Sequence, residues 1–492
     1  NFVDFSNERL LPHKLSQYGP GLAVADIDGN GLDDMFIGGT GDHNGTFFLQ
    51  QSNGTFKTRQ LDFVAGGNIR KPENSGVLFF DADNDGDDDL YCASGSNESP
   101  AQTRNYQDQF FVNDGKGNFK IDTAALPVNF TSKSCIKAAD IDNAGDLDLF
   151  IGGRILPGEY PMPVSSFIYR NDSKPGKIKF TDITDSIAPQ LKNIGLTCDA
   201  LWTDFDNDGQ TDLILAGEWK PITLFKNENG KLVNVTASTG IQNEKGWWNS
   251  IVACDFDNDG DIDYIAGNLG ENSFLQASNQ YPVNIYAKDF DNSGRISAIT
   301  TSYLKDQKGN KKEFPAATRD DVIMQLPFLK KKFFTYKSFA AADMHDIFSD
   351  SVLNGALHLQ ANNFASCYIE SLGKGKFKMH ALPAMAQLAP VFGMIADDFN
   401  YDGNPDVLLC GNDFGNEPAN GRYDAMNGLV MLGDGKGNFT AQTILQSGIC
   451  IPGNAKALVK LCGANNHELI AASQNRGPLE LYQLNRSEKN MK

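Results

Sequence analysis

A nine-residue segment rich in carboxylates occurs five times along this chain, each time between two short apolar runs. Every copy has oxygen-bearing side chains at positions 1, 3, 5 and 9 and glycine at position 6. Carboxylates this close repel one another unless a cation lies between them, and a shell of oxygen ligands suits Ca²⁺ better than Mg²⁺. The sequence therefore predicts about five Ca²⁺ ions, bound by Asp26, Asp28, Asn30, Asp34, Asp81, Asp83, Asp85, Asp89, Asp204, Asp206, Asp208, Asp212, Asp255, Asp257, Asp259, Asp263, Asp398, Asn400, Asp402 and Asp406.

These loops differ from the EF-hand, which shares positions 1, 3, 5 and 6 but also needs a Glu at position 12 and flanking helices. Position 12 is occupied here by Ile37, Cys92, Leu215, Ala266 and Leu409. The apolar runs on either side are short, and those that follow the loops mostly end at glycine, which is typical of buried strands. Each loop is therefore predicted to be the turn of a β-hairpin.

Two further copies of the loop are incomplete. The copy that begins at Asp140 has Ala144 at position 5, and the copy that begins at Asp289 ends in Ser297. We expect both to keep the hairpin turn and to bind metal weakly or not at all. An eighth hairpin, without the acids, is expected over residues 457–472.

Glycine-rich turns followed by an aromatic residue or Leu recur in step with the acidic loops, at residues 53–56, 114–119, 229–232, 373–377 and 434–439. Such turns are typical of tight hairpins and are predicted to join the third and fourth strands of each unit. Repeated four-stranded units indicate the blades of a β-propeller. We therefore expect an all-β fold in which residues 1–492 form one propeller of seven or eight blades. The approximate blades are 20–60, 75–122, 134–183, 197–236, 248–282, 283–382, 391–445 and 446–485.

One stretch, residues 318–348, departs from the β pattern and is predicted to be a helical insertion in the sixth blade. Thr318 is a suitable N-cap with Asp321 three residues later, and Pro327 would divide the helix. The insertion either covers an open sheet edge or serves as a docking surface for a partner. The sequence leaves both interpretations open.

The net charge of −19 argues against binding to nucleic acid, and about five Ca²⁺ ions would offset ten of these charges. No apolar run approaches the roughly 18 residues of a membrane-spanning helix. Loops of this kind suit millimolar calcium, which favours an extracellular location. Since the chain begins at Asn1, we expect a mature or trimmed chain or a fragment. Most of the cysteines are expected to be free thiols, and a Cys450–Cys462 pair remains open.

Connections in a four-stranded blade alternate between the two faces of the disc, so the acidic loops share one face. The loops expected on the opposite face carry aromatic, amide and charged side chains, which suit a glycan or peptide ligand. The candidate ligand-binding residues are Arg154, Tyr160, Glu218, Trp219, Trp247, Trp248, Asn268, Asn412, Arg422 and Tyr423. The alternative is that the tryptophans fill the space between blades.

Over nearly the whole chain, the acidic loops and glycine-terminated strands resemble the FG-GAP or VCBS repeats of integrin-α-like propellers. The loop sequences GGRILPGEYPMP, GEWKPI, GWWNSI, GNLGENS and NGRYDAMNG are similar to those of large Bacteroidota surface VCBS proteins, which are related to the UnbV and cartilage-acidic-protein group. The resemblance implies a seven-bladed, Ca²⁺-stabilised propeller, secreted or at the outer membrane, within a longer chain. It also implies a cell-surface protein partner, such as an outer-membrane complex of the SusC/SusD type. No catalytic residue carries over from the family.

The leading hypothesis is a non-catalytic, calcium-stabilised binding or assembly module that uses the face opposite the acidic loops to engage a protein or a glycan. The alternative is a polysaccharide lyase or glycoside hydrolase, with His13, Glu159, Glu218, Tyr423 and Asp424 as candidate residues. A glycosidase needs two carboxyl groups about 5–10 Å apart. The sequence contains no Gly-x-Ser-x-Gly, His-Glu-x-x-His or Cys-x-x-Cys motif.

Overall fold

The structure, a computed structural model, describes residues 2–62 and 72–485 and consists mainly of antiparallel sheets. The first three sheets are β1–β4 (Leu22–Ala25, Asp34–Ile37, Thr46–Gln50, Phe56–Gln60), β5–β8 (Glu73–Phe80, Asp89–Gly95, Gln109–Asn113, Phe119–Ile121) and β9–β12 (Ser132–Ala139, Asp148–Ile155, Phe167–Asn171, Phe180–Asp182). The fourth contains β13–β16 (Leu196–Thr203, Asp212–Pro221, Thr223–Asn227, Leu232–Asn234), and β17 (Lys245–Trp247) pairs with β14.

The fifth sheet combines β18 (Ser250–Cys254) and β19 (Asp263–Gly267) with β24 (Cys367–Ser371) and β25 (Phe377–Ala381). The sixth contains β26–β29 (Val391–Asp397, Asp406–Gly411, Leu429–Gly433, Phe439–Ala441), and the seventh contains β30–β32 (Ala455–Gly463, His467–Gln474, Glu480–Gln483). The first strand of each of these seven sheets contacts the first strand of the next, in the order β1, β5, β9, β13, β18, β26, β30, and β30 contacts β1. Such a closed ring of sheets is the β-propeller architecture, which confirms the predicted fold class.

The first and last sheets hold each other through backbone and side-chain hydrogen bonds. The Cys462 amide donates to Asp33 Oδ2 at 2.6 Å, and Gln50 Nε2 donates to the Cys462 carbonyl at 3.1 Å. Apolar side chains fill the space between every pair of neighbouring sheets, so the core is divided into wedges around the ring. Each sheet therefore buries both of its faces against its neighbours.

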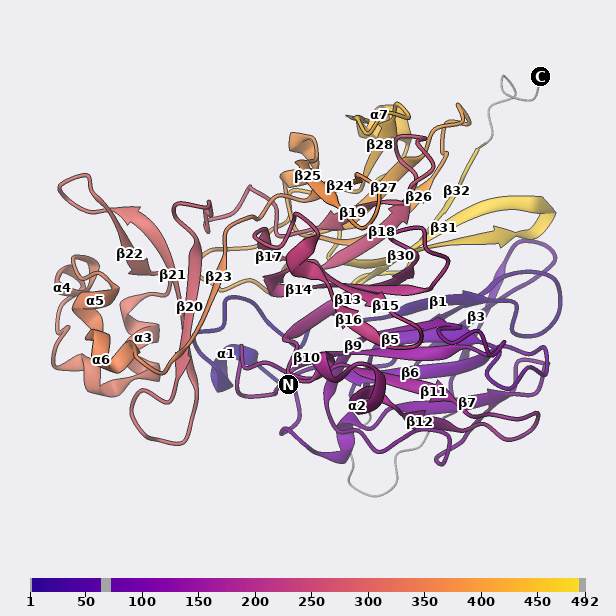
Figure 1. Cartoon of the computed structure of the whole chain (residues 1–492), viewed down its shortest axis with the longest axis horizontal. Coiled ribbons are helices and arrows are strands. Elements are labelled where there is room, and N and C mark those ends of the chain that lie inside the picture. The colour runs from indigo at the N-terminus through magenta and orange to yellow at the C-terminus, as the bar shows by residue number, and fades with distance from the viewer. Residues whose placement is uncertain (1, 63–71, 486–492) are drawn as a thin grey trace.

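An extra sheet lies outside the ring, with strand order β22–β21–β20–β23 (Lys311–Pro315, Ser297–Lys305, Val283–Lys288, Leu357–Ala361). It is inserted between β19 and β24, and Figure 1 shows it beside the ring. This differs from the prediction of separate blades over 248–282 and 283–382, because β19 pairs with β24 across the insertion. The incomplete loop at Asp289 does form a hairpin turn, between β20 and β21, but that hairpin belongs to the extra sheet.

The predicted helical stretch is confirmed within the insertion. It contains α3 (Arg319–Gln325), η4 (Pro327–Lys330), α4 (Tyr336–Ala340), α5 (Met344–Ile347) and α6 (Asp350–Leu353). The Thr318 side chain caps α3 by accepting from the Asp321 amide at 3.3 Å, and Pro327 separates α3 from η4 as expected. Elsewhere the helices are short: α1 (Asp4–Asn7), α2 (Thr184–Ile187), α7 (Ile444–Ser447), η1 (Arg104–Tyr106), η2 (Pro189–Leu191), η3 (Thr236–Ser238), η5 (Ala384–Gln387) and η6 (Ala464–Asn466).

Two apolar clusters hold the insertion: one joins it to the ring, and the other joins its sheet to its own helices. Trp219 and Trp247 of the fourth sheet, together with Leu11 and Leu15 of the N-terminal segment, pack with Val283 and Ile285 of β20. A second cluster joins Ile299 of β21 to the helices of the insertion. Because β19 leads from the acidic loops towards the opposite face, the insertion emerges from the face opposite those loops. No helix in the described ranges is long and apolar enough to cross a membrane.

Candidate metal loops and the opposite face

All five complete acidic loops share one backbone conformation. In the first loop Asp26 accepts hydrogen bonds from the amides of Asn30, at 3.1 Å, and Gly31, at 2.8 Å. The carboxylate at position 1 makes the same pair of bonds in the other four loops. The glycine at position 6 has φ between +82° and +94°, a region that strains residues with a Cβ atom. The glycine therefore allows the chain to turn around the first carboxylate.

The carboxylate at position 9 ties each loop to the third strand of its sheet. Asp34 accepts from the Gln50 amide, and Asp212 accepts from the Asn227 amide, both at 2.7 Å. Burial is the largest cause that raises the pKa of Asp34 and Asp212, in each case to about 7. A neighbouring cation would favour the charged form of these carboxylates and lower their pKa again.

The side chains of four loops fit a hard cation bound through oxygen. Carboxylate oxygens lie within 4.8 Å of one another in the groups Asp26–Asp28–Asp34, Asp81–Asp83–Asp85, Asp204–Asp206–Asp212 and Asp255–Asp257–Asp259. Three buried carboxylate oxygens in these loops lack a hydrogen-bond partner: Asp28 Oδ1, Asp89 Oδ2 and Asp206 Oδ1. Buried oxygens are rarely left without a partner, and these three lie one in each of three loops, so they support a cation bound at each of those loops. Ca²⁺ would supply the positive charge that the clustered carboxylates need.

The loops at Asp398 and Asp140 differ from these four, and one of the four, the third complete loop, also has a lysine among its carboxylates. In the loop that begins at Asp398, Asn400 Nδ2 donates to Asp402 Oδ2 at 3.0 Å, and among the described residues its carboxylates form no comparable group. The incomplete loop at Asp140 keeps the hairpin turn between β9 and β10. In the third complete loop, Lys226 of β15 places its ammonium against Asp206, and 2.8 Å from Asp208 Oδ2. Lys226 would therefore compete with a bound cation for these oxygens.

On the opposite face, the structure buries eight of the ten candidate ligand-binding residues. They are Arg154, Tyr160, Glu218, Trp219, Trp247, Trp248, Asn268 and Asn412. The N-terminal segment and the extra sheet cover most of this set, whereas Trp248 packs between the fourth and fifth sheets. Trp219, Trp247 and Trp248 are therefore core packing residues, which is the alternative interpretation given above. Asn268 and Asn412 hold loops by accepting from the amides of Trp247 and Met426, both at 3.0 Å.

Glu218 is the centre of a buried polar cluster. It pairs with Arg154, accepts from Tyr160 Oη at 3.0 Å, and lies 3.3 Å from His13 Nε2. Trp219 Nε1 donates to Tyr160 Oη at 2.7 Å. Burial alone would raise the pKa of Glu218, but Arg154 and His13 outweigh burial and hold it below its usual range. Glu218 is therefore ionised and fully partnered.

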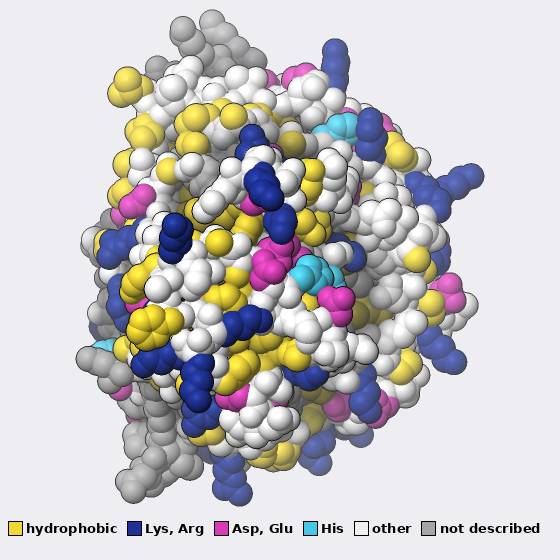
Figure 2. Space-filling view, turned by 90° about the vertical axis from the view of Figure 1, so that its left-hand side faces the viewer, with side chains coloured by type: hydrophobic (Ala, Val, Ile, Leu, Met, Phe, Trp, Pro, Cys, Tyr) yellow, Lys and Arg dark blue, Asp and Glu magenta, His cyan; other side chains and the backbone are white. Residues whose placement is uncertain are grey.

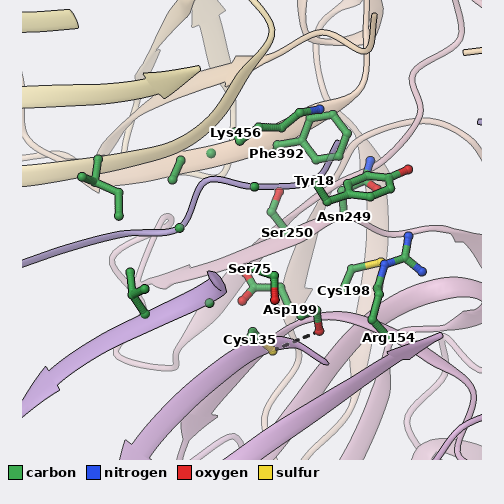
Figure 3. A pocket seen from close by; sticks show the side chains of 18 of the residues that line it. Tyr18, Ser75, Cys135, Arg154, Cys198, Asp199, Asn249, Ser250, Phe392 and Lys456 are labelled. Carbon is green, nitrogen blue, oxygen red and sulfur yellow. Dashed lines mark hydrogen bonds between the residues drawn. The ribbon is translucent and has the colours of Figure 1, made fainter. Parts of the chain in front are cut away.

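A cavity of about 400 Å³ extends from this cluster along the centre of the ring. Figure 3 shows Tyr18 near the side chains of Phe392, Lys456 and Arg154. The Arg154 guanidinium lies 4.9 Å from the centre of the Tyr18 ring, and Lys456 Nζ lies 3.6 Å from the centre of the Phe392 ring. Phe392 and Lys456 were not predicted as site residues, because nothing in a strand sequence marks which side chains point into the channel.

Arg422 and Tyr423 are the two candidate ligand-binding residues that are not buried. With Glu271, Asn272 and Asp424 they line an open depression of about 360 Å³. The Arg422 guanidinium lies 4.9 Å from the centre of the Phe414 ring, and Tyr423 Oη is 2.9 Å from Ser273 Oγ. This depression is an accessible part of the predicted ligand face.

The carboxylates considered for an enzyme occupy unlike environments. Glu159 is exposed, whereas Glu218 is buried and paired with Arg154. A glycosidase acid needs a raised pKa, and the pKa of Glu218 is lowered. All eight cysteines lie among the described residues and are free thiols, including Cys450 and Cys462.

Comparison with known proteins finds FG-GAP-like repeats at residues 26–92, 81–151 and 204–266. Mouse cartilage acidic protein 1 is 27% identical over 222 residues, which cover 43% of this chain and 31% of that protein. The chain thus matches under a third of that relative's length.

Among solved structures, BBS1N in complex with ARL6DN has a TM-score of 0.44 and 12% identity, covering 96% of this chain and 95% of that one. The Vibrio cholerae biofilm matrix protein Bap1 has a TM-score of 0.34 and 12% identity, covering 97% and 89%. The acidic loops, the ring of sheets and the matched repeats agree: residues 26–151 and 204–266 carry FG-GAP-like repeats, and the sheets that contain them belong to a β-propeller.

Proposed function

We propose that this protein is a non-catalytic, Ca²⁺-stabilised binding and assembly module that works outside the cell, either free or attached to the outer-membrane surface. The observation that carries the proposal is the convergence of carboxylate oxygens in four loops on one face of the ring, some of them buried without a partner. Ions bound there would fix the hairpins, and the millimolar calcium outside cells would keep the loops loaded.

A rigid ring of this kind leaves the opposite side free to engage a partner. The insertion on that side carries six large hydrophobic side chains with more than a third of their surface exposed: Leu304, Met324, Phe328, Phe334, Tyr336 and Val352. Clustered exposed apolar side chains mark protein interaction surfaces. The partner in this proposal is a cell-surface protein, such as an outer-membrane complex of the SusC/SusD type.

The depression beside Arg422 and Tyr423 supports a second ligand, a glycan. Its lining combines an aromatic ring, an amide and charged groups, which suit the hydroxyl groups and apolar faces of sugars. The polysaccharide-active enzyme has less support, because Glu218 is ionised and fully partnered by its neighbours. Cleavage of a polysaccharide by the pure protein would favour the enzyme over the binding module.

The test is co-purification of tagged protein from its native host membranes in gentle detergent with Ca²⁺. We expect one partner at stoichiometric yield, lost when Phe334→Glu places a charge on the insertion. The matched control is Val128→Glu, because Val128 is equally exposed, at 79%, on the ring. Recovery of the chain alone in every sample would contradict the assembly role.

A further inference from the structure

A groove on the insertion lies between the β21–β22 hairpin and the helices α3 and α4. It encloses about 690 Å³. Its floor is apolar, with Phe314, Phe339 and Ala342, and the ring of Tyr336 lies at its side. Tyr336 is 65% exposed and Leu304 is 42% exposed, so apolar surface is available to a ligand.

The rim of the groove is basic. Lys312 donates to Asp343 Oδ2 at 2.6 Å, and Arg319 donates to Asp320 at 2.8 Å, so these two cations are paired. Lys305 and Lys308 make no ion pair within the part of the chain that the structure describes. Asp306, the acid of the rim, accepts from the amides of Lys308 and Asn310, both at 2.8 Å. The groove therefore presents two lysines that make no ion pair, with one ionised carboxylate, Asp306, between them in the sequence.

The insertion differs in charge from the rest of the chain. Residues 283–361 hold eleven Lys and Arg against nine Asp and Glu, whereas the whole chain has a net charge of −19. Figure 2 shows the side of the molecule that carries the insertion, where Lys and Arg side chains lie among hydrophobic ones around a smaller acidic group. Complementary charge selects partners and repels others, so this side attracts acidic segments that the remainder of the surface repels.

We propose that this groove binds an acidic peptide segment of a partner protein, with an aromatic or aliphatic side chain on the groove floor and carboxylates at Lys305 and Lys308. The concave shape favours an extended peptide over a membrane surface, which cannot enter it. This inference rests on the proposed function, because it names the chemistry of the partner that the binding module takes.

The test uses the full chain in Ca²⁺ and a fluorescein-labelled peptide of Asp, Glu, Phe and Leu, with fluorescence anisotropy as the readout. The comparison peptide has Asn and Gln in place of the acids. We expect the acidic peptide to bind, and the amide peptide to bind at least about tenfold more weakly. The affinity should fall as salt rises, since exposed charges are screened.

Variants then locate the site. Lys305→Glu with Lys308→Glu should weaken binding at least about tenfold, and Ala340→Trp should fill the groove and do the same. The matched control is Lys174→Glu with Lys177→Glu, two exposed lysines of the third sheet. All three variants change exposed residues, and unchanged thermal melts would show that they fold.

The proposal is overturned if the two peptides bind equally, or if the groove variants bind as the unaltered protein does. It is also overturned if the protein binds anionic phosphatidylglycerol vesicles and the acidic peptide does not compete. If the native partner still co-purifies with the Lys305 and Lys308 variant, the groove assignment alone fails. If the peptide binds the groove but no partner is recovered from membranes, the assembly role alone fails.

Discussion

At the scale of single residues, the third acidic loop has a lysine that already offsets part of the negative charge of the proposed ligands. Lys226 pairs with Asp206 and Asp208, and these hydrogen bonds are the largest cause that raises its own pKa. Replacing Lys226→Met should therefore strengthen Ca²⁺ binding at this loop by about tenfold, which corresponds to roughly 1.4 kcal/mol. Calorimetric titration would measure the change, and Lys231→Met, at an exposed lysine of the same sheet, is the control. An unchanged affinity would mean that Lys226 leaves the loop when the ion binds.

A second residue-scale prediction concerns Lys456, which lies in the channel against Phe392. Burial is the largest cause that lowers the pKa of Lys456, to about 8 from its ordinary 10.5. Between these two pH values the unfolded chain holds a proton that the folded chain has lost, so the stability contributed by this group rises with pH. Lys456→Met removes the buried charge. We therefore expect the variant to gain stability at pH 7 relative to the unaltered protein, and to lose that advantage towards pH 10.

Urea unfolding of both proteins at several pH values would measure this difference. A pKa difference of one corresponds to about 1.4 kcal/mol, so the effect of Lys456 is a few kcal/mol at most. Comparison of the two proteins cancels the groups that they share. A stability difference that stays constant from pH 7 to 10 would contradict the assignment of a buried, deprotonating ammonium to Lys456.

At the scale of elements, the N-terminal segment acts as a cover for the polar cluster. Glu8 accepts from the Tyr160 amide at 2.9 Å, and the ring of His13 lies 5.4 Å from that of Trp247. Removing residues 1–18 should expose Trp219 and Trp247, each now only 4% exposed, and lower the unfolding free energy. Acrylamide quenching of tryptophan fluorescence should increase. The same truncation with Trp247→Phe should show a smaller increase, and equal quenching would mean that the segment does not cover Trp247.

The elements also show how far the sequence could predict the structure. Acid spacing and glycine positions set the conformation of each loop locally, so the hairpins from Asp26 to Asp406 were predictable. The extra sheet was not, because its Asp289 loop resembles the first hairpin of a blade. Pairing of β19 with β24 joins residues about 100 positions apart, and no local pattern records such a contact.

The candidate sites also divide into a part that the sequence could predict and a part that it could not. The ligands of the acidic loops are close in sequence, so their convergence follows from one turn. The burial of Trp219, Trp247 and Glu218 depends instead on which distant segment covers them. From the sequence alone, a polar or aromatic side chain in a loop is a candidate for ligand binding, because the sequence does not show which other segment covers it. Here the extra sheet and the N-terminal segment cover these side chains.

At the scale of the whole molecule, the ring unites seven sheets, and the acidic loops that six of them carry all lie on one face. The net charge of −19 disfavours that arrangement without bound cations. An ion that binds only the folded state stabilises it by mass action, by about 2.7 kcal/mol at one hundred times its dissociation constant. Because four loops present convergent carboxylates, removal of Ca²⁺ should lower the melting temperature of the entire ring.

Differential scanning calorimetry with EDTA and with millimolar Ca²⁺ would measure the shift, and Mg²⁺ at equal ionic strength is the control for charge screening. We expect Ca²⁺ to raise the melting temperature well beyond Mg²⁺, and native mass spectrometry to count at least four bound ions. Asp206→Ala should remove one ion and leave the others, because the loops lie in separate sheets. A melting temperature that is the same with EDTA and with Ca²⁺ would show that hydrogen bonds alone hold the acidic loops.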